Sequence, residues 1–206
     1  MTTLLHLIAT PRGEASNTLT VSRAVLERFK ERHPEGRVDT LDLFATELPA
    51  MTLKATDGKY RLLSGKELDD ETRPAWEPIL AHITRFKAAD IVLISTPMWN
   101  FGLPYVLKHY FDVILQPRHL FQYTANGPEG LAKGKKVVVV NSRGGDYSEG
   151  PGKAMDHVEP PLRTMLGFVG IPDPVFLTIQ PTLAGGPDVT KQKIEAALVE
   201  ARRLAL

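Results

Sequence analysis

The order of apolar and polar positions predicts a chain that alternates between strands and helices. Near-continuous apolar runs, which are typical of strands buried on both faces of a sheet, occur at Leu4–Ala9, Ile91–Ser95 and Lys135–Asn141. Val38–Leu43 alternates between apolar and polar positions as a strand does, and Val175–Ile179 is the last strand-like run. The pattern therefore predicts five strands spread over the chain.

Helical spacing occupies most of the segments between these strands. The strongest signal is at 103–114, where apolar residues fall at i, i+3, i+4, i+7, i+8 and i+11. Pro74 and Pro78 predict that the first part of the second helix is bent or broken. The predicted helices are Ser16–His33, Asp69–Ala89, Leu103–Ile114, His157–Gly170 and Thr190–Leu204.

Strands that alternate with helices predict an α/β fold. We expect residues 1–206 to form one three-layer domain, with a five-stranded parallel sheet and helices on both faces. Residues 45–68 lack a regular pattern and predict an irregular connection, a candidate lid or binding loop. Residues 121–127 end in Asn126-Gly127 and predict a small hairpin or an ordered insertion.

Composition excludes several classes of function. The net charge is +1 and no basic stretch carries interleaved aromatic residues, so neither nucleic acid nor an anionic membrane is an expected partner. No apolar run approaches the roughly 20 residues that cross a bilayer, and the expected location is the cytoplasm. The chain has no cysteine, and none of its six histidines pairs with another at metal-binding helical spacing, so no metal site is expected.

The first loop with chemical potential lies between the first strand and the first helix. It carries Thr10, Arg12, Ser16, Asn17 and Thr18 but neither the dinucleotide-binding glycine pattern nor the phosphate-loop lysine. Hydroxyls and amides at a helix N-terminus suit a single terminal phosphate. The alternative is that Ser16 or Asn17 only caps the helix.

Two further loops follow the third and fourth strands. One is Pro97, Met98, Trp99, Asn100 and Phe101, whose large apolar side chains could form a wall for a flat ring, or could pack locally. The other is Asn141, Ser142, Arg143, Gly144 and Gly145, where adjacent glycines allow close approach of the backbone to a ligand, or form a simple turn. The carboxyl ends of parallel strands share one end of a sheet, so all three loops should converge on a site suited to flavin mononucleotide (FMN).

These loops resemble those of the FMN-dependent NADH:quinone reductase and azoreductase family. The similarity runs over nearly the whole chain and extends to residues 123–130 and 166–171. It implies a flavodoxin-like fold, non-covalently bound FMN, NAD(P)H as co-substrate, and quinones and azo compounds as acceptors. It also implies a homodimer with the flavin near the interface.

The resemblance also implies roles for individual residues. Thr10 and residues 16–18 would hold the phosphate, residues 98–101 would line the ribityl chain and ring, and residues 142–145 would contact the polar edge of the ring. Tyr123 and Phe168 would be aromatic walls of the substrate pocket, reaching across the dimer. The cofactor would carry the chemistry, so no catalytic side chain is expected. The family usually has Ser at the position of Thr10 and Tyr at that of Trp99.

Two other functions on the same fold remain open at this point. One is a non-enzymatic electron carrier of the flavodoxin type, although such carriers are usually shorter and strongly acidic. The other is a ligand-binding or regulatory protein without redox activity.

Overall fold

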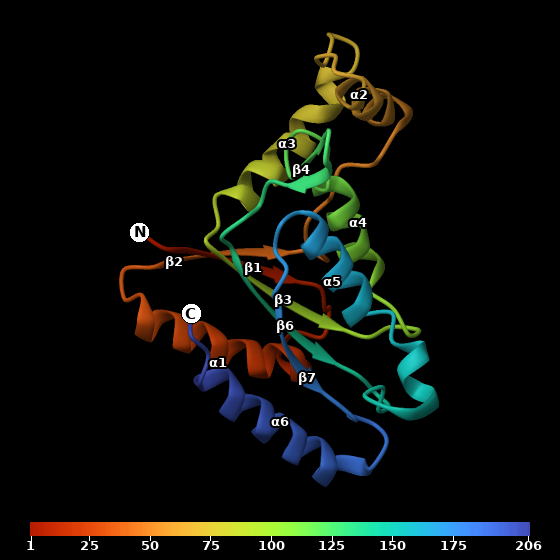
Figure 1. Cartoon of the computed structure of the whole chain (residues 1–206). Coiled ribbons are helices and arrows are strands. Elements are labelled where there is room, and N and C mark those ends of the chain that lie inside the picture. Colours follow the sequence, from red (N-terminus) through yellow and green to blue (C-terminus); the bar gives the residue numbers. More distant parts are fainter.

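A five-stranded parallel sheet forms the centre of the molecule. The computed structural model describes all 206 residues, and its main sheet has the strand order β2-β1-β3-β6-β7 (Figure 1). This order is that of a doubly wound α/β fold, in which the chain starts near the middle of the sheet and winds outward in both directions. The predicted fold class is confirmed. The strands are β1 (Thr3–Ile8), β2 (Arg37–Asp42), β3 (Ile91–Pro97), β6 (Lys136–Ser142) and β7 (Val175–Ile179).

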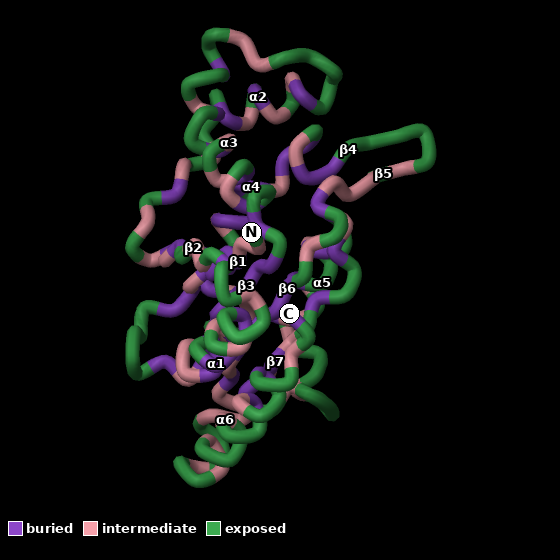
Figure 2. The backbone as a smooth tube through the Cα atoms, turned by 90° about the vertical axis from the view of Figure 1, so that its left-hand side faces the viewer, coloured by how far each residue is buried: buried purple, intermediate pink, exposed green.

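Helices cover both faces of the sheet and create two separate cores. Alternation along β1 directs Leu4 toward one core and Leu5 toward the other. The first core lies under α1 (Asn17–Arg32) and α6 (Gly186–Arg202). The second lies under α3 (Arg73–Lys87), α4 (Tyr105–Ile114) and α5 (Glu159–Phe168). Figure 2 shows buried positions along the strands of the sheet and exposed positions in the outer turns. None of the helices has the length and apolar character needed to cross a bilayer.

The five predicted helices are all present, with shifted ends. The first begins directly after Ser16, whose hydroxyl accepts a hydrogen bond of 3.3 Å from the N–H of Leu19. The second begins at Arg73 rather than at 69, because residues 69–72 form a turn in which Asp69 and Thr72 bond each other. Pro74 lies in its first turn and Pro78 lies inside it without ending it.

The prediction of an irregular connection at 45–68 was wrong. The segment contains α2 (Leu53–Leu63), which Thr52 caps by accepting a hydrogen bond from Ala55 N–H. The buried indole of Trp76 on α3 donates to the carbonyl of Ala55 at 2.9 Å, so α2 is attached to the body of the protein. The sequence pattern missed this helix because it is short and contains Gly58, a poor helix former.

The predicted hairpin is confirmed as β4 (Phe121–Thr124) paired antiparallel with β5 (Gly127–Gly130). Its second strand lies directly on the loop that follows α5. A Cβ atom added at Gly130 would lie 2.1 Å from the backbone nitrogen of Gly170, so only glycine permits this approach. The hairpin at 121–130 is therefore packed against the end of α5, although α5 begins about 30 residues later in the chain.

The contact between α2 and α3 generates a stability prediction. Replacing Gly58 by Ala places a Cβ atom 2.1 Å from Trp76 Nε1, so the free energy of unfolding should fall by about 1–3 kcal/mol despite the better helix propensity of Ala. Urea denaturation measures the change. Gly167→Ala is the matched control, because Gly167 is also helical and nothing lies within 4 Å of its added Cβ. Equal stabilities of the two variants would contradict the proposed packing.

Candidate functional site

Ser142 joins the three predicted loops at the carboxyl end of the sheet. Its hydroxyl lies 3.4 Å from that of Thr18, and its carbonyl accepts a hydrogen bond of 2.8 Å from the N–H of Met98. The first turn of α1, which follows β1 in the chain, therefore meets the ends of β3 and β6, as the sequence predicted. The meeting point consists of hydroxyl and amide groups, which suits recognition of an anion or of the polar edge of a ring.

The first loop presents hydrogen-bond donors at the start of α1. Thr10, Ser16 and Thr18 are buried, and the Ser16 hydroxyl donates to Thr18 Oγ1 at 3.2 Å. The N–H groups of Asn17 and Thr18 make no hydrogen bond within the chain, as is usual in the first turn of a helix. Ser16 also caps the helix, so the capping alternative describes one of its roles.

Charge around this loop favours an anion as ligand. Its single acidic residue, Glu14, is exposed and paired with Arg23 at 2.9 Å, so no carboxylate lies among the hydroxyls. Arg12 is exposed beside the short helical turn Gly13–Ala15. Free N–H groups, a helix N-terminus and hydroxyls without a competing carboxylate form a cradle that a phosphate group fits.

The second loop is a strained turn. Asn100 and Phe101 have positive φ angles of 47° and 69°, and Trp99 and Gly102 exchange two hydrogen bonds of 2.9 Å across them. A non-glycine residue in this region costs about 1–3 kcal/mol, so surrounding contacts must hold it. The turn leaves the N–H groups of Asn100 and Phe101 without acceptors in the chain.

Aromatic side chains flank this turn. Trp99 and Phe101 are 37% and 47% exposed, which is high for apolar groups at the end of a buried strand. Phe44, which follows β2, supports Trp99 at a ring-centroid distance of 5.6 Å, and Tyr147 meets Phe101 at 6.3 Å. Phe44 and Tyr147 lie outside the predicted motifs, because each comes from a connection whose path the sequence does not give.

In the third loop the carbonyls of Arg143 and Gly144 are bonded inside the protein, whereas the N–H groups of Gly144 and Gly145 are free. The carbonyl of Arg143 accepts from the N–H and the hydroxyl of Thr182, both at 2.9 Å, and that of Gly144 accepts from Leu183 and Ala184 N–H at 3.0 Å. The N–H groups of Gly144 and Gly145 make no hydrogen bond within the chain. Two adjacent donors are thus available to the electron-rich edge of a ligand.

The side chains of Asn141 and Arg143 do not face this ligand position. Both are buried, and the guanidinium of Arg143 donates to Asn141 Oδ1 at 2.8 Å and to Asp156 Oδ2 at 3.0 Å. Asn141 in turn donates to the hydroxyl of Thr178 on β7 at 2.9 Å. These two side chains, both of residues predicted in the cofactor-binding loop, therefore hold the loop from behind.

The ion pair between Arg143 and Asp156 also connects the second and third loops. The other carboxylate oxygen of Asp156 accepts from Val158 and Glu159 N–H at 2.9 and 3.2 Å and so caps α5. The next residue, His157, donates its N–H to the carbonyl of Phe101 at 2.9 Å. No sequence pattern points to Asp156, because only folding brings it next to Arg143.

Tyr123 and Phe168 lie away from the three loops. They gather around Phe121, with ring-centroid distances of 5.8 Å to Tyr123 and 4.7 Å to Phe168. The ten residues of α5, about 15 Å of helix, separate Phe168 from the His157 contact with Phe101. One chain therefore does not bring these two aromatic residues to its own site.

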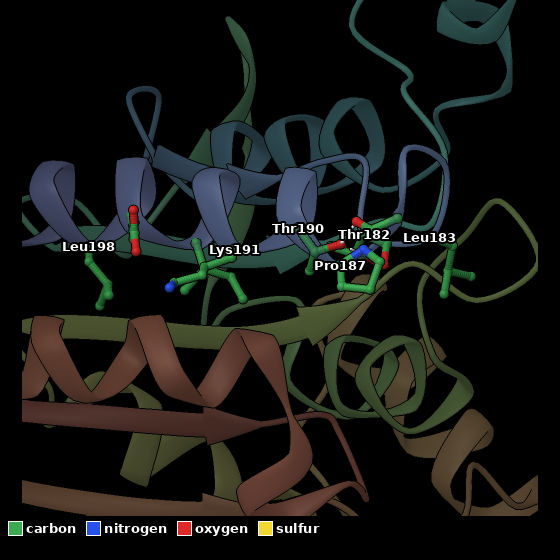
Figure 3. Close-up of a pocket in the computed structure, with 9 residues that line it drawn as sticks. Thr182, Leu183, Pro187, Thr190, Lys191 and Leu198 are labelled. Atoms are coloured by element: carbon green, nitrogen blue, oxygen red, sulfur yellow. Dashed lines mark hydrogen bonds between the residues drawn. The ribbon is translucent and has the colours of Figure 1, made fainter.

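A surface hollow of about 620 Å³ lies along α6 (Figure 3). The hollow borders the third loop through Leu183, whose side chain lies next to Gly144. Leu183 is itself 81% exposed. None of its lining residues belongs to the predicted site: Thr182, Leu183, Gly186, Pro187, Thr190, Lys191, Ile194, Glu195 and Leu198.

The chain is similar to known proteins in both sequence and fold. A family model for a flavodoxin-like fold matches residues 2–205. An FMN-dependent NADH:quinone oxidoreductase of Nitratidesulfovibrio vulgaris strain DP4 is 39% identical, with 100% of this chain and 99% of that protein aligned. FMN-dependent NADH:quinone oxidoreductase 2 of Pseudomonas syringae pv. tomato is 41% identical, with coverages of 98% and 97%. The solved structure of an FMN-dependent NADH-azoreductase from Bacillus anthracis, in complex with FMN, superposes with a TM-score of 0.87 at 27% identity over 100% of both chains.

The buried ion pair generates a second stability prediction. Asp156→Ala removes the nearer carboxylate of the buried Arg143 guanidinium, leaving only Glu159 at 3.8 Å, and should lower the free energy of unfolding by about 3–5 kcal/mol. The double variant Arg143→Met with Asp156→Leu should recover part of this loss, because it removes the buried charge, while the bonds of Asp156 to Val158 and Glu159 N–H and of Arg143 to Asn141 stay lost. Glu129→Ala, which removes an exposed pair with Lys133, is the control and should change stability little. If Asp156→Ala were as mild as Glu129→Ala in urea denaturation, the ion pair would not hold the loops.

Proposed function

Because the chain belongs to the flavodoxin-like-fold family of FMN-dependent NADH:quinone oxidoreductases and azoreductases, we propose that it binds FMN non-covalently and reduces quinones and azo compounds with NADH. The observation that carries the proposal is the set of three N–H pairs without acceptors in the chain, at residues 17–18, 100–101 and 144–145. Their loops meet at Ser142, next to two exposed aromatic side chains. Such a donor set complements a phosphate and a polar heteroaromatic ring.

Each loop would hold a different part of the cofactor. The hydroxyls of Ser16 and Thr18, with the free N–H groups at the start of α1, would bind the phosphate. The turn at 100–101 would meet the ribityl chain and ring, with Trp99 and Phe101 as apolar walls. When bound, FMN supplies the hydride chemistry that amino-acid side chains lack.

The glycines of the third loop would supply electrostatic assistance. The N–H groups of Gly144 and Gly145 would face the pyrimidine edge of the ring, where negative charge develops on reduction. The carbonyls of Arg143 and Gly144 belong to the same two peptide groups as these N–H donors, and residues 182–184 engage them, so the donors are oriented before any ligand binds. No step of this scheme requires an acidic or basic side chain at the site.

We propose that NADH and the acceptor use the same pocket in turn, which gives ping-pong kinetics. Trp99 would be the side chain that both molecules contact, because it is partly exposed and supported from behind by Phe44. Its indole is larger than a phenol ring and lacks a hydroxyl, so the pocket should favour flat apolar acceptors. Quinones and azo dyes share this flat shape.

We further propose a homodimer in which each subunit completes the site of the other. Tyr123 and Phe168 are exposed by 67% and 36%, and they lie at the far end of α5 from the loops of their own chain. Aromatic side chains presented in this way suit an interface, where they can cover an apolar ring. They would then be walls of the partner's substrate pocket.

Absorbance and turnover together test the proposed activity. The purified protein, or the protein given excess FMN, should show a flavin spectrum that NADH bleaches, and should oxidise NADH with a quinone and no partner protein. A protein that stays colourless with FMN would refute the cofactor. A yellow protein that needs a second protein for turnover would instead be an electron carrier.

Complementation between two inactive variants tests the shared site. Phe168→Ala damages only the partner's pocket, whereas Ser16→Ala with Thr18→Ala damages only the chain's own cofactor site. Co-expressed, the two variants should show more quinone reduction than either alone, because mixed dimers contain one intact site. Co-expression of Phe168→Ala with a chain carrying all three changes is the control and should give no recovery. Absence of recovery in both mixtures, or a monomeric mass by light scattering, would overturn the shared site.

A further inference from the structure

A buried chain of hydrogen bonds connects the middle of the sheet to the first helix. His6 on β1 lies 2.8 Å from the hydroxyl of Ser95 on β3, measured from Nε2 to Oγ. The Ser95 hydroxyl lies 2.6 Å from that of Ser22 on α1, and the Ser22 hydroxyl donates to the carbonyl of Thr18 at 2.9 Å. We refer to His6, Ser95 and Ser22 as the relay. All three side chains are at most 4% exposed.

The direction of the relay follows from counting protons. A carbonyl oxygen only accepts, so the single proton of the Ser22 hydroxyl is used toward Thr18. Ser95 must therefore donate its single hydroxyl proton to Ser22, so Ser95 can only accept from His6. His6 must donate from Nε2 to Ser95, which fixes the ring as the Nε2–H tautomer. Burial lowers the pKa of His6 to about 4, so the ring is neutral at pH 7.

The end of the relay lies at the cofactor cradle. Thr18 receives it at the carbonyl, while the Thr18 hydroxyl lies between those of Ser16 and Ser142 at 3.2 and 3.4 Å. The first turn of α1 also carries the free N–H groups of Asn17 and Thr18. A shift of this turn relative to β1 and β3 would therefore move every donor of the cradle together.

We infer that His6, Ser95 and Ser22 are positioning residues that set the depth of the first turn of α1 and so give the site its affinity for the phosphate of FMN. The inference rests on the proposed function. The sheet side of α1 is otherwise apolar, with Val21, Ala24, Val25 and Phe29 packed in the core, and apolar contacts are non-directional. The relay adds directional bonds at the level of the first turn, where precision matters most to a ligand.

Comparison of FMN with riboflavin, which lacks the phosphate, isolates this role. Ser22→Ala cuts the relay next to Thr18 and should weaken FMN binding about tenfold, equivalent to about 1.4 kcal/mol, while riboflavin affinity changes less than twofold. Ser22→Thr should restore FMN affinity, because a helical Thr hydroxyl can make the same bond to the carbonyl four residues earlier. Fluorescence titration of the purified apoprotein measures both affinities without any turnover.

A second variant tests whether the loss of FMN affinity comes from a buried polar group left without a partner. Combining His6→Leu, Ser22→Ala and Ser95→Ala replaces the relay by apolar groups and leaves no buried donor unpaired. It should lose FMN preference as Ser22→Ala does. Thr20→Ala is the matched control, because the Thr20 hydroxyl makes the same kind of bond within α1, at 3.1 Å to the Ser16 carbonyl, but reaches no strand. Its ratio of FMN to riboflavin affinity should equal that of the unaltered protein.

The outcomes separate this inference from the proposed function. If the unaltered protein prefers FMN and the relay variants keep the full preference, the inference is wrong and the function stands. Equal weakening of FMN and riboflavin would also overturn it, because the relay would then be only a stabilising element. An unaltered protein that binds neither flavin would refute the proposed function and the inference with it.

Discussion

The hydrogen bonds of Ser142 are the constraint on which the site depends. This residue ends β6, and through its hydroxyl and carbonyl it fixes the positions of the loops after β1 and β3. Parallel pairing of β3 with β6 places Pro97 opposite Ser142, so the register of the sheet sets the geometry of the loops. If the register slipped by one residue, every side chain at this end would change face. The geometry of the site therefore depends first on the register of the strands and only then on individual side chains.

Backbone groups provide most of the donors, and buried side chains keep them in place. Residues 182–184 engage the carbonyls of the third loop, the Arg143–Asp156 pair connects it to the second, and the relay supports the first. This division explains why polar residues such as His6 and Arg143 are buried at the carboxyl half of an apolar sheet. Each has satisfied partners, as a buried polar group requires, except that Arg143 Nη2 makes no hydrogen bond and lies 3.8 Å from Glu159.

Much of this organisation was predictable from the sequence, for identifiable reasons. Apolar runs predicted the strands because strands buried on both faces allow few polar positions, and 103–114 predicted a helix because its apolar spacing is unambiguous. The helix at 53–63 was missed because Gly58 and a polar surface hide its periodicity, whereas its stability comes from Trp76 on another helix. The side-chain directions of Arg143 and Asn141 were not predictable, because a motif gives the position of a residue in the chain but not the direction of its side chain.

The sequence by itself determined the class of fold, the three loops and the family, since these depend on local spacing and on residue types close together in the chain. Only the tertiary structure decided which groups of those loops face outward. It turned the amides of Gly144 and Gly145 toward the site and the guanidinium of Arg143 away from it, and it placed Tyr123 and Phe168 at the far end of α5. Such choices depend on partners such as Asp156, Thr182 and Phe121. These partners meet the loops only after the sheet has formed, because long-range contacts are set by packing and not by neighbouring residues.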